Sequence, residues 1–130
     1  RDGTSYTLTS LTGGKASIVI FWSRNCGYAI EAVPQIRELI VRLTSESTPV
    51  VFVIDEGPST ALDAVLKEKQ ITWPVHYDVR TRLGNAMRNF GTPQYYVVDA
   101  AGRIRFSRVA EIEDLYGRLE AVAAEGLNER

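Results

Sequence analysis

The chain has 130 residues, and its composition and charge exclude several classes of protein. Hydrophobic residues make up 45% and charged residues 24% of it, a balance typical of a globular protein and not of a disordered chain. With 15 basic and 16 acidic residues the formal net charge is −1, so bulk electrostatics predict binding neither to nucleic acid nor to an anionic membrane. At this length we expect a single domain over residues 1–130.

The cysteine and histidine content limits disulfide and metal chemistry. Cys26 is the only cysteine and His76 the only histidine, so an internal disulfide is excluded and the usual ligands of a zinc site are missing. We therefore expect no metal and no cofactor. No apolar run approaches the ~20 residues that span a bilayer, and no basic and apolar leader opens the sequence. Because the chain begins at Arg1, this pattern does not identify its compartment.

Apolar runs predict an alternation of strands and helices in the first two thirds of the chain. Short β-branched or aromatic runs, bounded by polar or turn residues, predict buried strands over Ile18–Trp22, Val50–Ile54 and Tyr95–Val98. Apolar residues at helical spacing predict helices between them, marked by Ile30, Val33, Ile36 and Ile40, then by Leu62, Val65 and Leu66, then by Leu83, Met87 and Phe90.

The last third of the chain predicts a β-hairpin and a closing helix. Asp99–Gly102 separates Tyr95–Val98 from a second run, Ile104–Val109, and the closing helix is marked by Ile112, Leu115, Tyr116, Leu119 and Val122. Two shorter patterns, Tyr6–Leu11 and Val75–Tyr77, also fit strands. Together these elements predict an α/β sandwich with a mixed sheet, central parallel strands, a C-terminal β-hairpin and helices on both faces.

Cys26 lies just after the first predicted strand, where the first long helix is expected to begin. Backbone N–H groups and the helix dipole stabilise a thiolate at such a position and lower the thiol pKa. The neighbouring Arg24 is expected to add to this effect. The alternative is that Cys26 is a small buried hydrophobic residue, since unpaired cysteines are often buried.

Three further features set Cys26 in a functional context. Gly27 permits close approach of another backbone, and Pro34 is expected to kink the helix. Thr92-Pro93 directly precedes a buried strand, where a cis bond at a tight turn leaves neighbouring backbone free to pair with an extended peptide.

The segment Phe21–Ala29 resembles the Phe-Trp-x-x-x-Cys-x-x-Cys active site of the thioredoxin superfamily, in particular its TlpA-like branch and the related peroxidase-like redoxins. Pro34 matches the helix-kinking proline of these proteins, Gly91-Thr92-Pro93 matches their cis-proline segment, and Asp99–Ile104 matches their Asp-x-x-Gly hairpin turn. The resemblance covers nearly the whole chain and implies a thioredoxin-like α/β/α sandwich.

The resemblance implies a thiol:disulfide oxidoreductase in which Cys26 is the attacking thiol. The partners would be a protein or small-molecule disulfide or thiol and an external thiol reductant. Family resemblance also implies an extracytoplasmic protein of the bacterial envelope, and it allows a membrane tether outside the given chain. The residues expected to surround the substrate are Trp22, Gly27, Tyr28, Ala29, Thr92 and Pro93.

Two departures from the family pattern bear on the mechanism. Ala29 stands where the second cysteine, which resolves the mixed disulfide, belongs. Ala32 stands where the family has an acidic residue, and the adjacent Glu31 points about 100° away around the helix.

Four hypotheses for Cys26 remain open at this level. The protein is a natural monothiol oxidoreductase, or it is a dithiol enzyme altered by a Cys-to-Ala exchange at position 29. Alternatively it is a one-cysteine thiol peroxidase with Ser23 as its hydroxyl group, or a redox-silent module that binds extended peptide. In the last case Tyr28, Trp22, Trp73 and Tyr95 are candidates to line the binding surface, although the core is the better expectation for all four.

Overall fold

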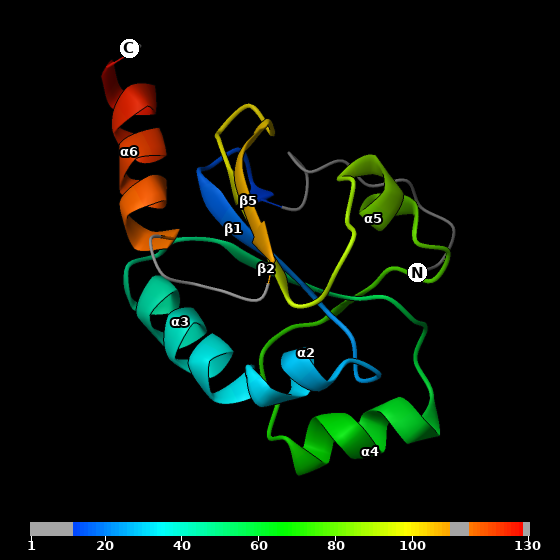
Figure 1. Cartoon of the computed structure of the whole chain (residues 1–130). Coiled ribbons are helices and arrows are strands. Elements are labelled where there is room, and N and C mark those ends of the chain that lie inside the picture. Colours follow the sequence, from blue (N-terminus) through cyan, green and yellow to red (C-terminus); the bar gives the residue numbers. More distant parts are fainter. Residues whose placement is uncertain (1–11, 110–114, 129–130) are drawn as a thin grey trace.

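One mixed sheet of five strands organises the chain. The computed structural model describes residues 12–109 and 115–128. Its strands are β1 (Ser17–Trp22), β2 (Val50–Ile54), β3 (His76–Tyr77), β4 (Gln94–Val98) and β5 (Ile104–Val109). The spatial order is β3-β2-β1-β4-β5. β1, β2 and β3 run parallel, whereas β4 is antiparallel to both β1 and β5, so the predicted mixed sheet and hairpin are confirmed (Figure 1).

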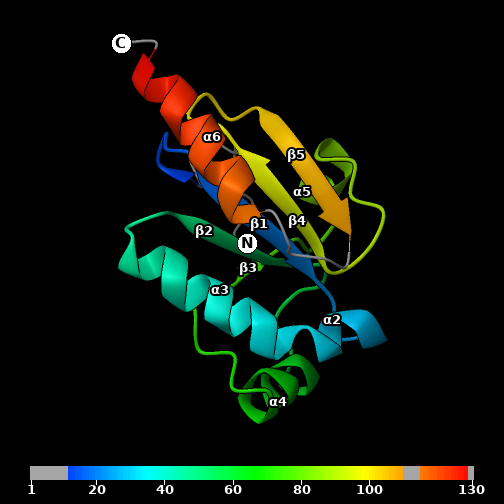
Figure 2. The same cartoon turned by 60° about the vertical axis from the view of Figure 1, so that its left-hand side comes forward.

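Five helices surround this sheet in the described residues. They are α2 (Gly27–Glu31), α3 (Val33–Ser45), α4 (Thr60–Glu68), α5 (Arg82–Ala86) and α6 (Leu115–Asn128). Figure 2 shows α3 and α6 over one face of the sheet. α5 packs on the other face, where Leu83 and Met87 contact a second cluster that includes Val19 and Phe21. The expectation of helices on both faces is thereby confirmed.

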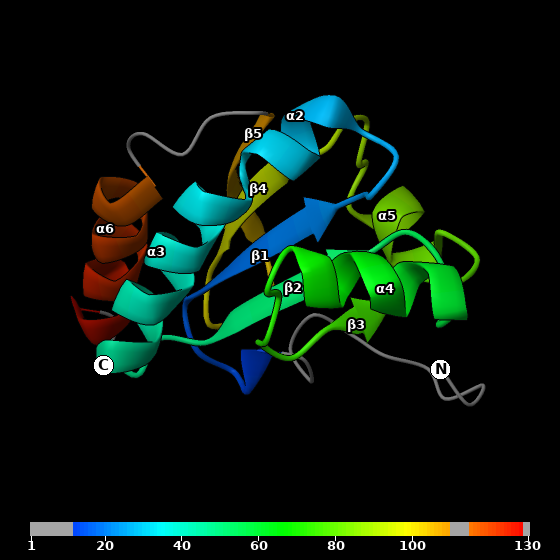
Figure 3. The same ribbon diagram turned by 90° about the horizontal axis from the view of Figure 1, so that it is seen from below.

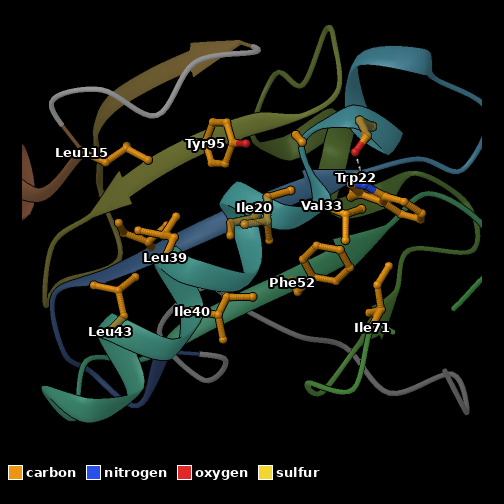
Figure 4. Close-up of a cluster of buried hydrophobic side chains, with 14 of the residues drawn as sticks. Ile20, Trp22, Val33, Leu39, Ile40, Leu43, Phe52, Ile71, Tyr95 and Leu115 are labelled. Atoms are coloured by element: carbon orange, nitrogen blue, oxygen red, sulfur yellow. Dashed lines mark hydrogen bonds between the residues drawn. The ribbon is translucent and has the colours of Figure 1, made fainter. Parts of the chain in front are cut away.

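The larger core lies between the sheet and α3, α4 and α6. Side chains that alternate along the strands, such as Ile18, Ile20 and Trp22 of β1, point into it. Ile36 and Leu43 of α3 are fully buried against them. Figure 4 shows how strand and helix side chains fill this space. Burial of each large apolar side chain contributes about 1.5–3 kcal/mol to stability. Because Trp22, the last residue of β1, is buried in this cluster, its packing holds the end of β1 in place.

The predicted first helix is broken into α2 and α3. Ala32 separates them with φ −80° and ψ −9°, and Pro34 occupies the first turn of α3. Proline has no N–H to donate to the carbonyl four residues earlier, and its ring crowds that turn. The predicted kink is therefore confirmed.

Two parts of the predicted secondary structure need separate comment. The short strand predicted at Val75–Tyr77 is present as β3, whereas Tyr6–Leu11 and Ile112 lie outside the described residues. Phe90 was expected on the apolar face of a helix, and that expectation is wrong. α5 ends at Ala86, Arg88 adopts φ +55°, and Phe90 is 80% exposed.

No helix within residues 12–109 and 115–128 has both the length and the apolar character needed to cross a bilayer.

Candidate functional site

The predicted site residues meet at one edge of the sheet, which we call the Cys26 edge. It comprises the loops that follow β1, β2 and β3 and the loop that precedes β4 (Figure 3). Parallel strands place their carboxyl ends at the same edge, and β4 enters there because it runs antiparallel to β1. The topology thus brings Cys26 and Thr92 together, although 66 residues separate them.

Cys26 is the residue that begins α2. Its backbone is extended, with φ −116° and ψ 120°, and its carbonyl accepts the Ile30 N–H at 3.0 Å. No side chain caps this end of α2. The thiol is partly exposed, so the expected position of Cys26 at a helix start is confirmed and the fully buried alternative is not.

The Cys26 sulfur contacts the segment that precedes β4. The thiol donates a hydrogen bond to the Thr92 carbonyl, with 3.0 Å between Sγ and O. A thiolate has no proton to donate, so this bond exists only in the neutral form and favours it. Other groups around the sulfur favour the anion.

The net effect of these groups is a lowered pKa of the Cys26 thiol. The Thr92 side chain lowers the pKa most, the Ala29 N–H lowers it further, and burial opposes them. The Tyr28 N–H also lowers it, whereas the negative charge of Asp55 raises it. Hydrogen-bond donors directed at a sulfur stabilise the thiolate, which is the nucleophilic form of cysteine.

Pro93 directly follows Thr92 in the segment that contacts Cys26. The Thr92-Pro93 peptide bond is cis, as the sequence predicted. Pro93 itself is buried. The carbonyl of Thr92 is directed at the sulfur, so this segment meets Cys26 through backbone as well as side chain.

Trp22 and Ala29 support the site from below. Both side chains are fully buried, and the Trp22 indole Nε1–H donates to the Ala29 carbonyl at 2.7 Å (Figure 4). Neither side chain reaches the surface, so in this structure both lie beneath the sulfur. The Trp22 hydrogen bond holds the peptide of Ala29, and the Ala29 N–H is one of the groups that lower the pKa of Cys26.

Gly27 and Tyr28 lie on the exposed side of the sulfur. A Cβ built on Gly27 has nothing within 4 Å, so this position leaves open space next to Cys26. Tyr28 is 71% exposed. Of the aromatic residues considered from the sequence, Tyr28 is the one at the surface of the site, whereas Trp22 and Tyr95 belong to the core.

Arg24 does not act as expected. Its guanidinium Nε lies 3.0 Å and 2.8 Å from the two carboxylate oxygens of Glu56. This ion pair joins the loop after β1 to the loop after β2 and neutralises both charges locally. Arg24 therefore stabilises the Cys26 loop by linking it to the loop after β2. The pKa of Cys26 is lowered by hydrogen bonds instead.

Asp55 is a carboxylate near Cys26 that local sequence patterns do not single out. It follows β2 directly, and because Trp22 is paired with Ile54, Asp55 lies beside Ser23. Partial burial raises the pKa of Asp55, a hydrogen bond from Ser23 lowers it, and the charge of Glu56 raises it further. Asp55 is distant from Cys26 in the sequence. Only the parallel pairing of β1 with β2, which aligns the ends of the two strands, indicates that the two residues are close.

The Cys26 edge presents a reactive sulfur together with groups that tune it. No group of three or more His, Cys, Asp or Glu side chains in the described part of the chain is arranged to hold a metal ion. What the edge does offer is a partly exposed sulfur, donors that stabilise its anion and a carboxyl group with a raised pKa.

Comparisons with known proteins agree with this geometry. A model of the AhpC/TSA family matches residues 1–107. The thiol-disulfide oxidoreductase YkuV of Bacillus subtilis is 29% identical over 103 residues, which cover 76% of this chain and 70% of that protein.

Solved structures show the same architecture. A thioredoxin-like protein in its oxidised form is 28% identical, with a TM-score of 0.71 over 94% of this chain and 86% of the other. StoA from Bacillus subtilis has a TM-score of 0.70 at 18% identity, over 81% of each chain, which shows likeness of fold alone. The fold is thioredoxin-like, as the sequence predicted.

Proposed function

Because the chain belongs to the AhpC/TSA family, within the thioredoxin superfamily, we propose that it is one thiol:disulfide exchange domain that acts through Cys26 alone. The observation that carries this proposal is the environment of the sulfur, which is partly exposed and has a lowered pKa. Thr92 and Pro93 would lie beside the sulfur of the substrate, with Gly27 and Tyr28 on its open side and Trp22 and Ala29 as support.

The proposed reaction has two exchange steps. The Cys26 thiolate attacks one sulfur of a disulfide, a Cys26–substrate disulfide forms, the original S–S bond breaks, and the other sulfur leaves as a thiolate that takes a proton from solvent. In the second step an external thiol, as its thiolate, attacks the mixed disulfide and releases Cys26. Residue 29 is alanine, so the second step needs another molecule.

Asp55 is the proposed proton carrier of the site. The acidic position of the family is occupied by Ala32, which is buried at the junction of α2 and α3. Asp55 lies within electrostatic range of the sulfur, and its raised pKa suits a group that exchanges protons.

Two other hypotheses have less support. A one-cysteine peroxidase was expected to use the Ser23 hydroxyl, but that oxygen accepts the Asn25 N–H at 3.2 Å and also bonds to Asp55. A redox-silent peptide-binding module has no need of a thiol with a lowered pKa.

We further propose, on family resemblance, a location outside the cytoplasm.

The proposal is tested by intact mass measurement after incubation with oxidised glutathione. We expect the present chain to gain one glutathione adduct, the Cys26→Ser variant to gain none, and the Ala29→Cys variant to convert its adduct into an internal disulfide. Position 29 lies about one helical turn after Cys26 at the start of α2, so a thiol there would be close to the Cys26 sulfur. If neither the present chain nor Ala29→Cys reacts, the oxidoreductase proposal is wrong. Reaction with peroxide and not with disulfides would favour the peroxidase.

A further inference from the structure

The segment between β3 and β4 carries an unusual set of exposed side chains. Residues 79–93 include three arginines and no acidic residue, in a chain whose net charge is −1. Two of its apolar side chains are exposed, Val79 to 53% and Phe90 to 80%. We call Val79, Arg80, Arg82, Arg88 and Phe90 the basic-aromatic patch.

Both ends of this segment belong to the Cys26 edge. Val79 follows β3, and a Cβ on Gly57, next to Glu56, would lie 3.5 Å from Val79 Cγ2. Glu56 is the partner of Arg24 in the Cys26 loop. At the other end, Phe90 is two residues before Thr92, whose carbonyl oxygen lies 3.0 Å from Sγ. A polypeptide with its cysteine at Cys26 therefore runs within reach of the patch.

Phe90 is held at the surface by the structure of its loop. Gln94 Oε1 accepts hydrogen bonds from the Phe90 N–H at 3.1 Å and from Asn89 Nδ2 at 2.7 Å. Asn89 Nδ2 also donates to the Gly91 carbonyl at 3.0 Å, and a Cβ on Gly91 would come within 3.0 Å of Val109. Burying a phenylalanine side chain away from water is favourable, so a fixed and exposed one favours a partner that covers it.

The arginines of the patch are available for a partner. Arg80, Arg82 and Arg88 are exposed, and none of them forms an ion pair with any residue in the described ranges. Two carboxylates next to this segment already have partners. Glu56 pairs with Arg24, and Asp78 accepts the Leu83 and Gly84 N–H groups at 3.0 Å and 2.8 Å. Guanidinium groups bind carboxylates strongly and in a defined geometry.

We propose that the basic-aromatic patch docks a protein substrate whose reactive cysteine is flanked by acidic and apolar side chains. This inference rests on the proposed function, since it names the substrate class for the same site. Charge complementarity sets the preference for acidic residues, and Phe90 and Val79 set the preference for apolar ones. Electrostatic attraction of this kind acts chiefly on the association rate and weakens with salt.

The test uses two peptides with a central cysteine capped by thionitrobenzoate. One has Asp and Phe around the cysteine, and the other has Lys in place of each Asp. Attack by Cys26 forms a disulfide with the peptide and releases one thionitrobenzoate anion, whose absorbance gives the rate. At low salt we expect the acidic peptide to react about tenfold faster than the lysine peptide, with the ratio falling towards one as salt is added. A neutral disulfide, bis(2-hydroxyethyl) disulfide, measures the basal reactivity of each variant by mass.

Variants locate the effect. The triple change Arg80→Gln, Arg82→Gln and Arg88→Gln is expected to bring the ratio of the two peptide rates to about one, and Phe90→Ser to slow the acidic peptide about threefold. The matched control is Lys15→Gln, Lys67→Gln and Arg118→Gln, three exposed residues that form no ion pair among the described residues and lie away from the Cys26 edge, and it is expected to keep the ratio. Far-UV circular dichroism checks that each variant is folded.

The possible failures are distinguishable. If no probe reacts with Cys26, including the neutral disulfide, the proposed function is wrong. If the probes react but the wild-type ratio is near one, or the control triple lowers it as much as the patch triple, the docking inference is wrong. Self-association that is lost in Phe90→Ser, together with equal peptide rates, would show that the patch binds a second copy of this chain and would overturn the inference.

Discussion

The two ends of the same sheet are built in opposite ways. At the β4–β5 turn, buried Asp99 accepts the Ala101 and Arg103 N–H groups at 3.0 Å and 2.9 Å and the Arg103 Nε–H at 3.1 Å. At the Cys26 edge, the sulfur is partly exposed, and Tyr28 and Phe90 face solvent. The first end therefore satisfies its polar groups internally, whereas the second leaves a nucleophile and aromatic rings exposed, beside arginines that form no ion pair within residues 12–109 and 115–128. The proposed exchange chemistry is assigned to the end of the sheet where the reactive group is exposed.

The largest expected effect is at the sulfur. Cys26→Ser removes the only thiol of the chain, so we expect complete loss of adduct formation with any disulfide. Stability should change little, because Cys26 is only partly buried. Intact mass and thermal unfolding measure the two effects. An adduct on the serine variant would contradict the assignment.

The second largest effect is expected at the β4–β5 turn, at the opposite end of the sheet. Asp99→Ala leaves the Ala101 and Arg103 N–H groups without their carboxylate, and we expect it to lower the free energy of unfolding by about 3 kcal/mol. Urea denaturation measures this loss. Glu38→Ala, at an exposed position of α3, is the control and should change the unfolding free energy by less than about 0.5 kcal/mol. The reactivity of Cys26 should be retained in folded Asp99→Ala.

The Asp99 contribution also has a defined pH dependence. Burial alone would raise the pKa of Asp99, but the Arg103 and Ala101 N–H groups and the Arg103 charge together lower it. A carboxyl whose folded pKa is lowered stabilises the fold above its unfolded pKa of about 3.9 and loses this effect as pH falls through the folded value. The difference in stability between wild type and Asp99→Ala should therefore be full at pH 7 and shrink below about pH 4.

A third effect compares the two tryptophans. Trp22→Phe removes the donor to the buried Ala29 carbonyl. We expect it to lower the free energy of unfolding, measured by urea denaturation, by about 2 kcal/mol. Trp73→Phe is a matched control, because the Trp73 Nε1–H has no hydrogen-bond partner among the described residues. It should cost less. Equal losses of unfolding free energy in the two variants would show that the Trp22 hydrogen bond contributes little to stability.

The smallest effect concerns Asp55. The negative charge of Asp55 raises the pKa of Cys26, so Asp55→Asn should lower the thiol pKa further. If Asp55 also carries protons, the same variant should slow disulfide exchange despite the larger thiolate fraction. Glu31→Gln, at the exposed end of α2, should change both quantities less. A raised Cys26 pKa in Asp55→Asn would contradict the proposed electrostatics.

The sequence predicted the elements better than their contacts. Local patterns located the strands, the start of α2 after Cys26 and the break before Pro34. These features depend on periodicity and on residues close in the chain.

Features that depend on distant residues were missed or misjudged. The pairing of Arg24 with Glu56 reverses the expected role of Arg24, since the parallel register of β1 and β2 brings an acid to it. Phe90 fits the helical period of Leu83 and Met87, yet α5 ends before it and leaves it exposed. Apolar spacing does not show where such a helix stops.

The central claim is that Cys26 is an activated, attacking thiol, and the pH dependence of its alkylation tests this most directly. The rate of reaction with iodoacetamide, followed by intact mass from pH 5 to pH 10, reports the fraction of thiolate. Since the Thr92 side chain and the Ala29 N–H lower the pKa of Cys26, the rate should reach half its maximum below the ordinary thiol value of about 8.5. A midpoint at or above that value would contradict the claim.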